Sequence, residues 1–416
     1  MSGSRERFNR LVVKFGGSSL SDGPSVSRAV DAVLDKARKG FQIAVVVSAM
    51  GKTTDHLIET AKKACGGTIK DEELDDIMAL GERTSARIFA AALKTRGQRS
   101  CYLDPVDPDW PIITDGSFTN ANPILPLCEG LIRAHIQPLL EEGNVVVIPG
   151  FIGKTGNGTV TTMGRGGSDI TAFVLAHGLS ADQVILVTDV DGIMTADPKV
   201  VGKPRILKEI SMDMLVGLAD SGTKFIHKKA LRYKNPSIEI KVINNTYGSL
   251  AVDGTTIKGS FPNNIVVEEH PDPAMAVTIV GKAIAESPQT IQQVFQELKK
   301  ADIALLGMSL NHNSLILYMP TKKKEEILEP LHSIVVSNER TIALAVRENL
   351  AFIKVKGVGL EETPGIISDI TKSLHSSGIN IYGIFTITSS VLIFVDLKDK
   401  DRTIRLIEEN IRTNTG

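Results

Sequence analysis

Short apolar runs recur along the first part of the chain, and each has the length of a buried strand. The runs are rich in β-branched residues and are bounded by turn residues. They cover residues 11–15, 43–48, 145–149 and 184–188. A strand that is apolar throughout is typical of a sheet covered on both faces. The pattern therefore predicts a buried and largely parallel sheet.

Amphipathic stretches lie between these runs. Residues 24–38 carry an apolar stripe at helical spacing, which is formed by Val26, Ala29, Val30, Val33 and Ala37. Residues 74–93 and 125–140 are also long enough for helices. Strands alternate with helices up to about residue 245, so we expect an α/β fold with a mostly parallel sheet sandwiched by helices.

The last third of the chain contains an internal repeat. Apolar, glycine and proline positions recur at a constant offset, so that Val277, Ile279, Gly281 and Pro288 correspond to Ile353, Val355, Gly357 and Pro364. Each copy has the pattern strand, helix, strand, strand, helix. This is the order of a ferredoxin-like βαββαβ unit, and we expect two such units.

The two copies end differently. The first closes with an apolar run at residues 342–346, whereas the second ends with a helix at residues 401–412. The final strand of the second copy is therefore missing or is borrowed from elsewhere. An open sheet edge is often covered by another chain, so we expect a homo-oligomer.

These patterns also predict the domain boundaries. We expect a first domain at residues 1–250, a linker with scattered Gly, Pro and Asn at 251–272, and the repeat units at 273–348 and 349–416. A chain of 416 residues, 42% of them hydrophobic, has enough apolar material for several packed domains.

Composition excludes several classes of protein. The net charge of −1 and the pI of about 6.7 give no sign of nucleic-acid binding. The three cysteines, Cys65, Cys101 and Cys128, fit neither a metal spacing nor a disulfide framework, which favours reduced thiols. No apolar run is long enough to span a membrane, and the polar start lacks the apolar segment of a signal peptide. We expect a cytoplasmic protein that binds small molecules or other protein chains.

The segment KFGGSS follows the first predicted strand. Gly16 and Gly17 let the backbone approach a ligand and direct successive N–H groups at it, and Lys14 adds a full charge at the strand tip. A helix that starts near Pro24 could add its positive end. The lysine precedes the glycines, so this is not a Walker A loop. On this segment alone, a plain strand-to-helix turn is an equal alternative to a phosphate site.

The segment TTMGRGGSDITA places three glycines around Arg165. Glycine-rich chain that enters a helix forms an anion site, and the guanidinium of Arg165 suits a carboxylate or a phosphate. We expect Ser168 to cap the helix, and Asp169 to orient a cation or Lys14. The alternative is a capped helix with a solvated arginine.

Three further segments carry polar residues. In VTDVDGIMTADPK, Asp189, Asp191 and Asp197 do not fit the spacing of a Ca²⁺ loop, which favours a loop that lines a nucleotide over a merely polar turn. SAMGKTTD places hydroxyl groups after a strand. GERTSAR places Glu82 and Arg83 on an apolar helix, where an ion pair is the alternative to a site.

The candidate residues converge on one edge of the sheet. Lys14, Ser48 and Asp189 follow predicted strands directly, and Arg165 follows the 145–149 strand and its hairpin. In open α/β sheets, ligands bind beyond the carboxyl ends of the strands. The convergence supports a ligand site there.

Together, the segments KFGGSS, SAMGKTTD, GER, GRGGSD and TDVDGIMTADP resemble those of the amino-acid kinase superfamily, in particular the aspartate kinases (aspartokinases). The match covers residues 11 to about 231. The repeat resembles the tandem regulatory ACT domains of that family. The resemblance implies an amino-acid kinase fold followed by two ACT domains. It implies MgATP-dependent phosphorylation of L-aspartate to 4-phospho-L-aspartate, the first step towards lysine, methionine and threonine.

The resemblance also implies roles for matching residues. Lys14, Asp169 and Lys224 would be catalytic, with Lys14 stabilising charge on the transferring phosphoryl group. Glu82 would pair with the substrate ammonium and Arg165 with its α-carboxylate, aided by Ser48, Thr54 and Ser168. ATP would be bound by Lys14, Gly16, Gly17, Ser18, Thr188, Asp189, Met194, Lys199 and Lys224.

The chain departs from the family pattern in places. Met194 stands where a tyrosine often lies near the nucleotide, and the proline that usually follows the histidine of TKFIHKKAL is absent. The second repeat keeps a candidate effector site with Pro364, Gly365 and Asn380, whereas the first repeat has Gln289 and Ala304 at equivalent positions. Lysine or threonine would be the effector.

Two other functions stay open on the residues alone. One is another carboxylate or phosphate kinase of the superfamily, and the other is a catalytically silent amino-acid sensor. Glu82 and Arg165 favour an amino-acid substrate, and Lys14, Asp169 and Lys224 favour a working enzyme.

Overall fold

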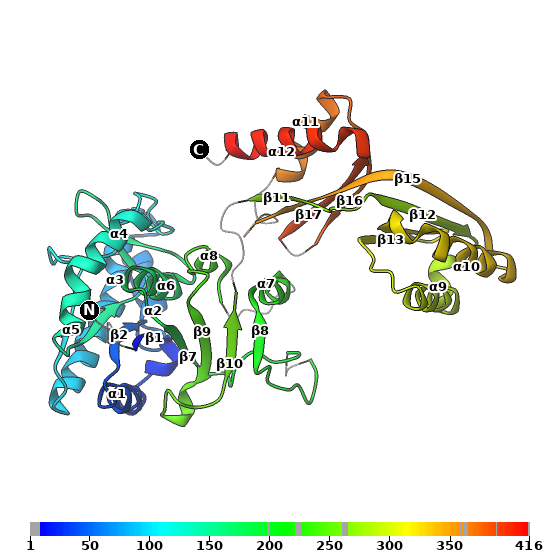
Figure 1. Cartoon of the computed structure of the whole chain (residues 1–416). Coiled ribbons are helices and arrows are strands. Elements are labelled where there is room, and N and C mark those ends of the chain that lie inside the picture. Colours follow the sequence, from blue (N-terminus) through cyan, green and yellow to red (C-terminus); the bar gives the residue numbers. More distant parts are fainter. Residues whose placement is uncertain are drawn as a thin grey trace, which may run out of the picture. The chain divides into compact units, whose positions relative to one another are not determined.

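The computed structural model describes residues 9–197, 200–220, 226–259, 265–357, 360, 365–387 and 389–414. The chain divides into two compact units, Met1–Asn263 and Asn264–Gly416. Figure 1 shows the elements of each unit.

The first unit is built on an eight-stranded sheet with the order β3-β4-β2-β1-β7-β9-β10-β8. The strands from β3 to β9 in this order pair in parallel, and β10 runs antiparallel to β9. A separate hairpin is formed by β5 and β6. The strands are β1 (Arg10–Phe15), β2 (Gln42–Val47), β3 (Ser100–Tyr102), β4 (Val145–Pro149), β5 (Ile152–Lys154), β6 (Val160–Thr162), β7 (Gln183–Thr188), β8 (Glu209–Ser211), β9 (Glu239–Asn244) and β10 (Thr255–Lys258).

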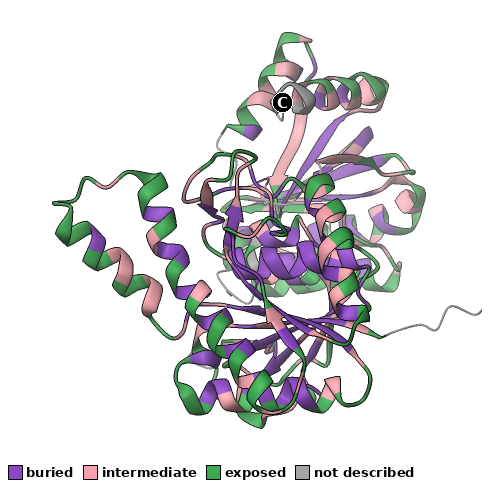
Figure 2. Ribbon diagram, turned by 90° about the vertical axis from the view of Figure 1, so that its left-hand side faces the viewer, coloured by how far each residue is buried: buried purple, intermediate pink, exposed green. Residues whose placement is uncertain are grey.

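Helices surround this sheet. They are α1 (Gly23–Ala37), α2 (Thr53–Ala64), α3 (Asp71–Thr95), α4 (Leu125–Leu131), α5 (Gln137–Glu141), α6 (Gly167–Leu179), α7 (Met212–Asp220) and α8 (Lys228–Leu231). Apolar residues of α1 and α3 pack with Val13, Val45 and Val147 in one core cluster. Helix α6 is buried along almost its whole length, as expected for a helix that is apolar on all sides. Figure 2 shows buried residues running along the strands, with exposed residues on the outer helices.

The sequence predicted the central strands well. The four predicted runs coincide with β1, β2, β4 and β7 to within one residue at each end. The helix predicted at residues 125–140 is interrupted by a π-helical segment, Ile132–Ile136. Pro138 lies two residues after the end of this segment, and because proline has no N–H to donate, one regular helical hydrogen bond is missing where α5 begins.

The second unit contains a seven-stranded antiparallel sheet. Its order is β13-β14-β12-β15-β17-β16, and β11 also pairs with β15. The strands are β11 (Val266–Glu269), β12 (Ala274–Gly281), β13 (Gly307–Asn311), β14 (Ser314–Pro320), β15 (Thr341–Lys356), β16 (Ile381–Thr386) and β17 (Ser390–Asp396). The helices are α9 (Pro288–Lys300), α10 (Lys324–Ser337), α11 (Ile366–Ser376) and α12 (Lys400–Asn414). The expected α/β fold with two ferredoxin-like repeats is confirmed.

The long strand β15 belongs to both repeats. Its first part, from Thr341 to Leu350, pairs with β12, and its last part pairs with β17 and with β11. Strand β11 takes the place of the final strand that the second repeat lacks, so this strand is borrowed from a segment that precedes both repeats. The span 251–272, predicted as a linker, thus contains β10 and β11. Because β11 covers this edge, the open-edge argument for an oligomer no longer applies there.

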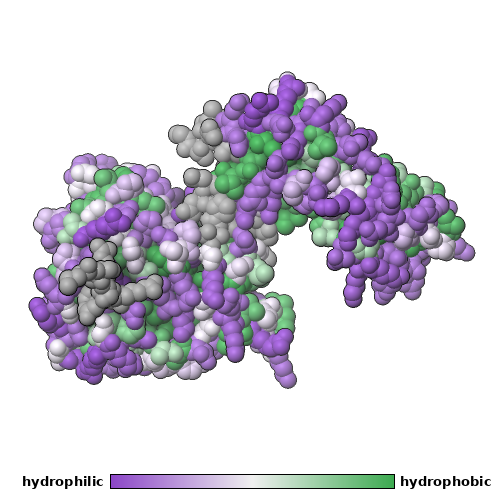
Figure 3. Space-filling model, in the orientation of Figure 1, coloured by the Kyte–Doolittle hydropathy of each residue, from purple (hydrophilic) through white to green (hydrophobic). Residues whose placement is uncertain are grey.

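In the view of Figure 3, hydrophilic residues cover most of the visible surface of each unit. Among the described residues, no helix is both long enough and apolar enough to cross a bilayer.

Candidate active site

A cavity of about 300 Å³ lies in the first unit, beyond the carboxyl ends of β1 and β2. It is lined by Lys14, Ser48, Thr54, Glu82, Phe151, Gly164, Gly166, Gly167, Ser168 and Asp169. Most of the predicted catalytic and substrate-binding residues therefore meet in one place.

Lys14 and Asp169 form an ion pair at this cavity. Lys14 Nζ lies 2.7 Å from Asp169 Oδ1, and both side chains are largely buried, with 17% and 12% of their surface exposed. Lys14 is on β1, whereas Asp169 is in the first turn of α6. The predicted orientation of Lys14 by Asp169 is confirmed, and the pair holds a cation at the tip of the central strand.

Glu82 is the second charged group of the cavity. It lies on α3 with only 4% of its surface exposed, and its Oε1 accepts a hydrogen bond from the N–H of Ala49 at 3.1 Å. Within the described part of the chain, Glu82 Oε2 is buried and has no hydrogen-bond partner. Burial raises the pKa of Glu82 to about 7, against the lowering effect of the hydrogen bond from Ala49. An unpaired buried carboxylate oxygen is suited to a cationic ligand group.

Glu82 and Arg83 do not pair with each other, which excludes the alternative of a local ion pair. Arg83 Nη2 instead lies 2.9 Å from Asp104 Oδ1, and Arg87 contacts the same carboxylate. These arginines hold the pKa of Asp104 below its usual value, against the effect of burial. Asp104 therefore holds the side of α3 next to Glu82 through the two arginines. The Glu82 carboxylate is not used by these arginines and faces the cavity.

Ser48 and Ser168 lie side by side in the cavity wall. Ser48 Oγ donates to Ser168 Oγ at 2.9 Å. The prediction that Ser168 caps α6 is wrong. The N-cap residue is Gly166, which has a φ of 78°, and the side chain of Ser168 points to Ser48 because it already lies inside the first turn. The hydroxyl is thereby placed at the cavity.

The KFGGSS segment forms a tight 3₁₀ turn, Gly17–Leu20. The N–H of Gly16 donates to Val187 O, and the first N–H groups of such a turn have no partner within it. Gly17 packs closely on the next loop, since an added Cβ would lie 2.9 Å from Ala49 O. The glycine at this position is therefore required by packing.

The predicted contribution from the start of α1 is not supported. Asp22 already caps this helix by accepting a hydrogen bond from Ser25 N at 2.8 Å, which satisfies one of its first N–H groups. The helix whose first turn lines the cavity is α6, through Gly167, Ser168 and Asp169. Its N-terminus supplies the positive end of a helix dipole there.

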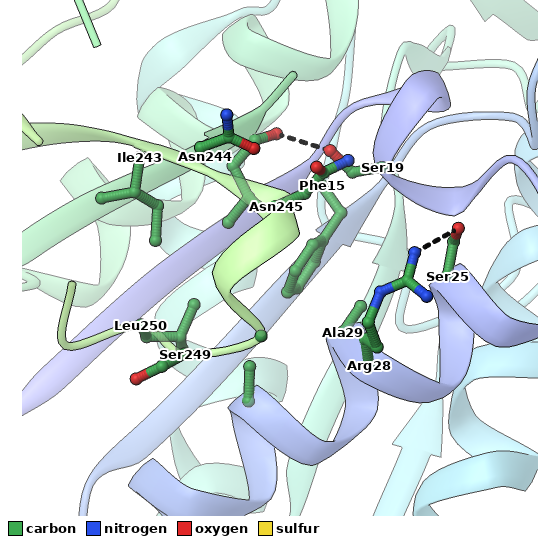
Figure 4. Close-up of a pocket in the computed structure, with 13 residues that line it drawn as sticks. Phe15, Ser19, Ser25, Arg28, Ala29, Ile243, Asn244, Asn245, Ser249 and Leu250 are labelled. Atoms are coloured by element: carbon green, nitrogen blue, oxygen red, sulfur yellow. Dashed lines mark hydrogen bonds between the residues drawn. The ribbon is translucent and has the colours of Figure 1, made fainter. Parts of the chain in front are cut away.

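A very small second cavity, of about 10 Å³, lies behind this turn (Figure 4). Ser19 Oγ donates to Val187 O at 3.3 Å beside it, and Arg28 donates to Ser25 Oγ at 2.9 Å. The space holds at most about one water molecule. Its walls therefore support the turn from behind, and the space is too small for a substrate.

The loop after β7 carries the predicted nucleotide-binding residues Thr188, Asp189 and Met194. Asp189 is exposed and accepts a hydrogen bond from Thr188 Oγ1 at 3.1 Å, while Met194 is half-buried and bridges to Ile206. Predicted residues Lys199 and Lys224 lie outside the described residues, as does Pro364.

Two residues that sequence reasoning missed anchor this loop. Asn244, at the end of β9, donates to Asp191 Oδ1 at 2.8 Å, and Thr255 Oγ1 accepts a hydrogen bond from Ile193 N at 2.8 Å. Gly192 has a φ of 135°, and a Cβ there would lie 2.6 Å from Thr255 Oγ1. A polar residue that ends an apolar strand was the signal available for Asn244.

Arg165 lies between two glycines with left-handed backbone. Gly164 and Gly166 have φ values of 71° and 78°, and Arg165 itself is exposed. It does not line the cavity, although Gly164, Gly166 and Gly167 do. Phe151, which sequence reasoning also missed, lines the cavity with a φ of 69°, and Gly167 packs against it. A non-glycine residue in this region is strained and is often found at functional sites.

In the second unit, two residues of the candidate effector site are described. Gly365 has a φ of 93° and caps α11, and Asn380 is exposed just before β16. They lie on either side of α11: Gly365 precedes its first residue, and Asn380 comes four residues after its last.

Comparisons with known proteins agree with this geometry. Residues 9–244 match the model of the amino acid kinase family. An aspartokinase of Geobacillus stearothermophilus is 30% identical over 380 residues, which cover 89% of this chain and 89% of that protein. The crystal structure of the aspartate kinase from Synechocystis has a TM-score of 0.79 and 25% identity, covering 96% of this chain and 69% of that one. E. coli aspartokinase III, solved with aspartate and ADP, shares the fold with a TM-score of 0.55 and 23% identity, over 96% of this chain and 99% of that one.

Proposed function

Since the chain belongs to the amino acid kinase family and is an aspartate kinase, we propose that the cavity around Lys14 is where its reaction takes place. The reaction is the ATP-dependent phosphorylation of the side-chain carboxylate of L-aspartate, which gives 4-phospho-L-aspartate. It is the first step in the biosynthesis of lysine, methionine and threonine.

One observation carries this assignment of the site. The same cavity contains a lysine ammonium, held by Asp169, and the buried, unpaired oxygen of Glu82. Aspartate carries an ammonium group and a side-chain carboxylate that receives the phosphoryl group. Glu82 binds the ammonium, and the hydroxyls of Ser48, Thr54 and Ser168 orient the substrate. The exposed Arg165 binds the α-carboxylate through its planar guanidinium.

The residue types suit phosphoryl transfer to a carboxylate. The acceptor is already a nucleophile, so the site needs alignment and charge stabilisation more than a strong base. Lys14 stabilises the charge on the transferring group, and Asp169 keeps its ammonium in place. The N–H groups of Gly17 and Ser18 would face the phosphates, and Gly16, whose own N–H donates to Val187 O, would allow the backbone to approach them closely. Thr188, Asp189 and Met194 line the nucleotide, together with Lys199 and Lys224.

Mg²⁺ enters the proposal with the nucleotide. Among the described residues, no group of three or more His, Cys, Asp or Glu side chains is placed to hold a metal ion. This fits Mg²⁺, which is bound mainly by phosphate oxygens and water with one or two carboxylates. The cavity has two carboxylates, Glu82 and Asp169; Asp169, next to Lys14, would be the one near the ion, which would neutralise charge on the phosphates.

The second unit suggests assembly and regulation by an amino acid. We infer a cytoplasmic homo-oligomer that assembles through its ACT region. An amino-acid effector, lysine or threonine, would bind at the second repeat, near Pro364, Gly365 and Asn380. Of these residues, the exposed Asn380 offers its side-chain amide to a ligand, and the left-handed Gly365 shapes the turn into α11.

A coupled assay of ADP release, run with a panel of amino acids, tests the function. We expect ADP release that depends on aspartate and ATP. Release with another acid in place of aspartate would indicate a different carboxylate kinase, and no release with any acid would indicate a silent sensor.

A further inference from the structure

Lys229 is held by an unusual set of contacts. It lies in α8, and its ammonium donates to Asn120 O at 2.9 Å, Asn120 Oδ1 at 2.8 Å, Ala121 O at 2.9 Å and Met163 O at 3.0 Å. All four acceptors are neutral oxygens, and they come from two segments that are far apart in the sequence. One ammonium therefore joins three parts of the first unit.

Partial burial makes the hydrogen bonds of the Lys229 ammonium necessary. The side chain is partly buried, and burial lowers the pKa of Lys229 to about 8, while the nearby carboxylate of Asp115 acts in the opposite direction. A desolvated ammonium is costly unless its hydrogen bonds are made. The four acceptors must therefore stay in place, and their segments are fixed relative to α8.

One of the joined segments leads directly into the glycine-rich loop that carries Arg165. Met163, an acceptor of Lys229, is followed by Gly164, whose added Cβ would lie 3.0 Å from Asn120 Oδ1. On the other side, an added Cβ on Gly166 would lie 2.4 Å from His227 Cβ. His227 caps α8 by accepting from the N–H of Lys229. The loop is therefore packed between the segment of Asn120 on one side and the start of α8 on the other, and Lys229 connects these two.

A buried carboxylate also holds these two segments, through the residues just before Asn120 and Met163. Asp75 accepts hydrogen bonds from Thr119 N at 2.9 Å, Thr162 N at 2.8 Å and Thr162 Oγ1 at 2.5 Å. Asp75 lies two turns before Glu82 on α3 and is fully buried. The start of the loop is thus held by two charged side chains, the carboxylate of Asp75 on α3 and the ammonium of Lys229 on α8.

We propose that Lys229 is a positioning residue for the amino-acid substrate, which fixes the loop of residues 163–167 so that Arg165 can bind the α-carboxylate of aspartate. This inference rests on the function proposed above. It predicts an effect on aspartate and not on ATP, because the loop after β7 that binds the nucleotide is anchored separately by Asn244 and Thr255.

The test compares steady-state kinetics of Lys229→Met with those of Lys234→Met. Lys234 is a matched control, because its buried ammonium also donates to backbone oxygens, of Asn235 at 3.0 Å and Gly259 at 2.7 Å. Burial likewise lowers the pKa of Lys234 to about 8. We expect Lys229→Met to raise the KM for aspartate about tenfold or more, with the KM for ATP changed less than about twofold. Lys234→Met should change neither constant, whatever stability it loses.

Equal KM values for aspartate in the two folded variants would overturn the inference, as would a parallel rise in both Michaelis constants of Lys229→Met. If Lys229→Met does not fold, Asn120→Ala decides, because it removes one acceptor of Lys229 at an exposed position. A selective rise of about threefold in its KM for aspartate supports the inference, and an unchanged KM contradicts it. Absence of aspartate-dependent turnover in the unaltered protein would contradict the proposed function itself, and the inference with it.

Discussion

Lys14 Nζ lies 2.7 Å from Asp169 Oδ1 at the tip of the central strand, and both groups face the cavity. In the proposed mechanism, a cation fixed in this way is positioned before the substrate binds, so its charge is available when the phosphoryl group is transferred. The same pairing explains why the lysine precedes the glycines: it stands on the strand itself, and the turn after it packs against the neighbouring loop.

Lys14→Ala should remove nearly all turnover while the fold is kept. We expect kcat to fall by at least about 100-fold, because the main positive charge of the site is lost. Circular dichroism and kcat measured on the purified variant check this prediction. Lys39→Ala, which removes an exposed lysine paired with Asp35, is the control and should keep normal turnover. A near-normal kcat for Lys14→Ala would rule out the proposed role.

Glu82 should give the enzyme a pH dependence that is specific to aspartate. Its pKa is raised to about 7 by burial, so the carboxylate that we propose to bind the substrate ammonium is protonated as the pH falls below this value. We expect kcat/KM for aspartate to fall about tenfold per pH unit below about pH 7. The value of kcat/KM for ATP at saturating aspartate should show no such limb, because bound ammonium keeps Glu82 ionised.

Glu82→Gln tests whether the Glu82 carboxylate causes the fall of kcat/KM for aspartate below about pH 7. The variant should have a low kcat/KM for aspartate that no longer changes between about pH 6 and pH 8. An unchanged limb in Glu82→Gln would assign the titration to another group.

At the residue scale, the sequence reveals groups whose neighbours in the chain mark them as unusual. Lys14, Glu82 and Asp169 stand in glycine-rich or apolar segments, and all three reach the cavity. Asp75 and Lys229 gave no such signal, because their partners are mainly backbone groups of distant segments. Only the fold brings those groups together.

At the element scale, the turn after β1 and the first turn of α6 define the site together. Apolar period and length were enough to predict β1, β2, β4 and β7. They did not locate the start of α6, because Gly166, and not Ser168, takes the capping position. A serine before an apolar stretch is a good signal for a cap, but a glycine with positive φ two residues earlier competes with it.

Gly17→Ala tests the close packing of the turn. The added Cβ would lie 2.9 Å from Ala49 O and 3.1 Å from Gly51 O, so the turn or the loop after β2 must move. Because this loop also carries Ser48 and places the N–H that binds Glu82, we expect kcat/KM for aspartate to fall about tenfold or more. Gly23→Ala is the matched control, since an added Cβ there meets no atom within 4 Å. Equal activity of the two variants would show that the turn accommodates a Cβ at position 17 without disturbing the site.

At the scale of the whole molecule, the chain consists of two units with separate cores. The apolar cluster between the sheet and α1 and α3 belongs to the first unit, whereas Val277, Leu317 and Ile393 lie in cores of the second. The repeat could be recognised from sequence because its two copies share apolar positions. The borrowed strand β11 could not, because a strand of four residues with a half-polar pattern resembles any connecting segment.

Val267 in β11 provides a test of this borrowed strand. It lies opposite Val355 of β15 and packs against the core of the second repeat, whereas the next residue, Glu268, is exposed. Val267→Asp places a charge against that core and should lower the unfolding temperature of the second unit by about 2–6 °C. Glu268→Thr, on the opposite face of the same strand, should have little effect. Calorimetry with and without ATP assigns the transitions, since a ligand that binds the first unit raises only the transition of that unit. If β11 completes the second repeat, the transition that Val267→Asp lowers is the one that ATP leaves unchanged, and a shift in the ATP-sensitive transition alone would contradict this role of the strand.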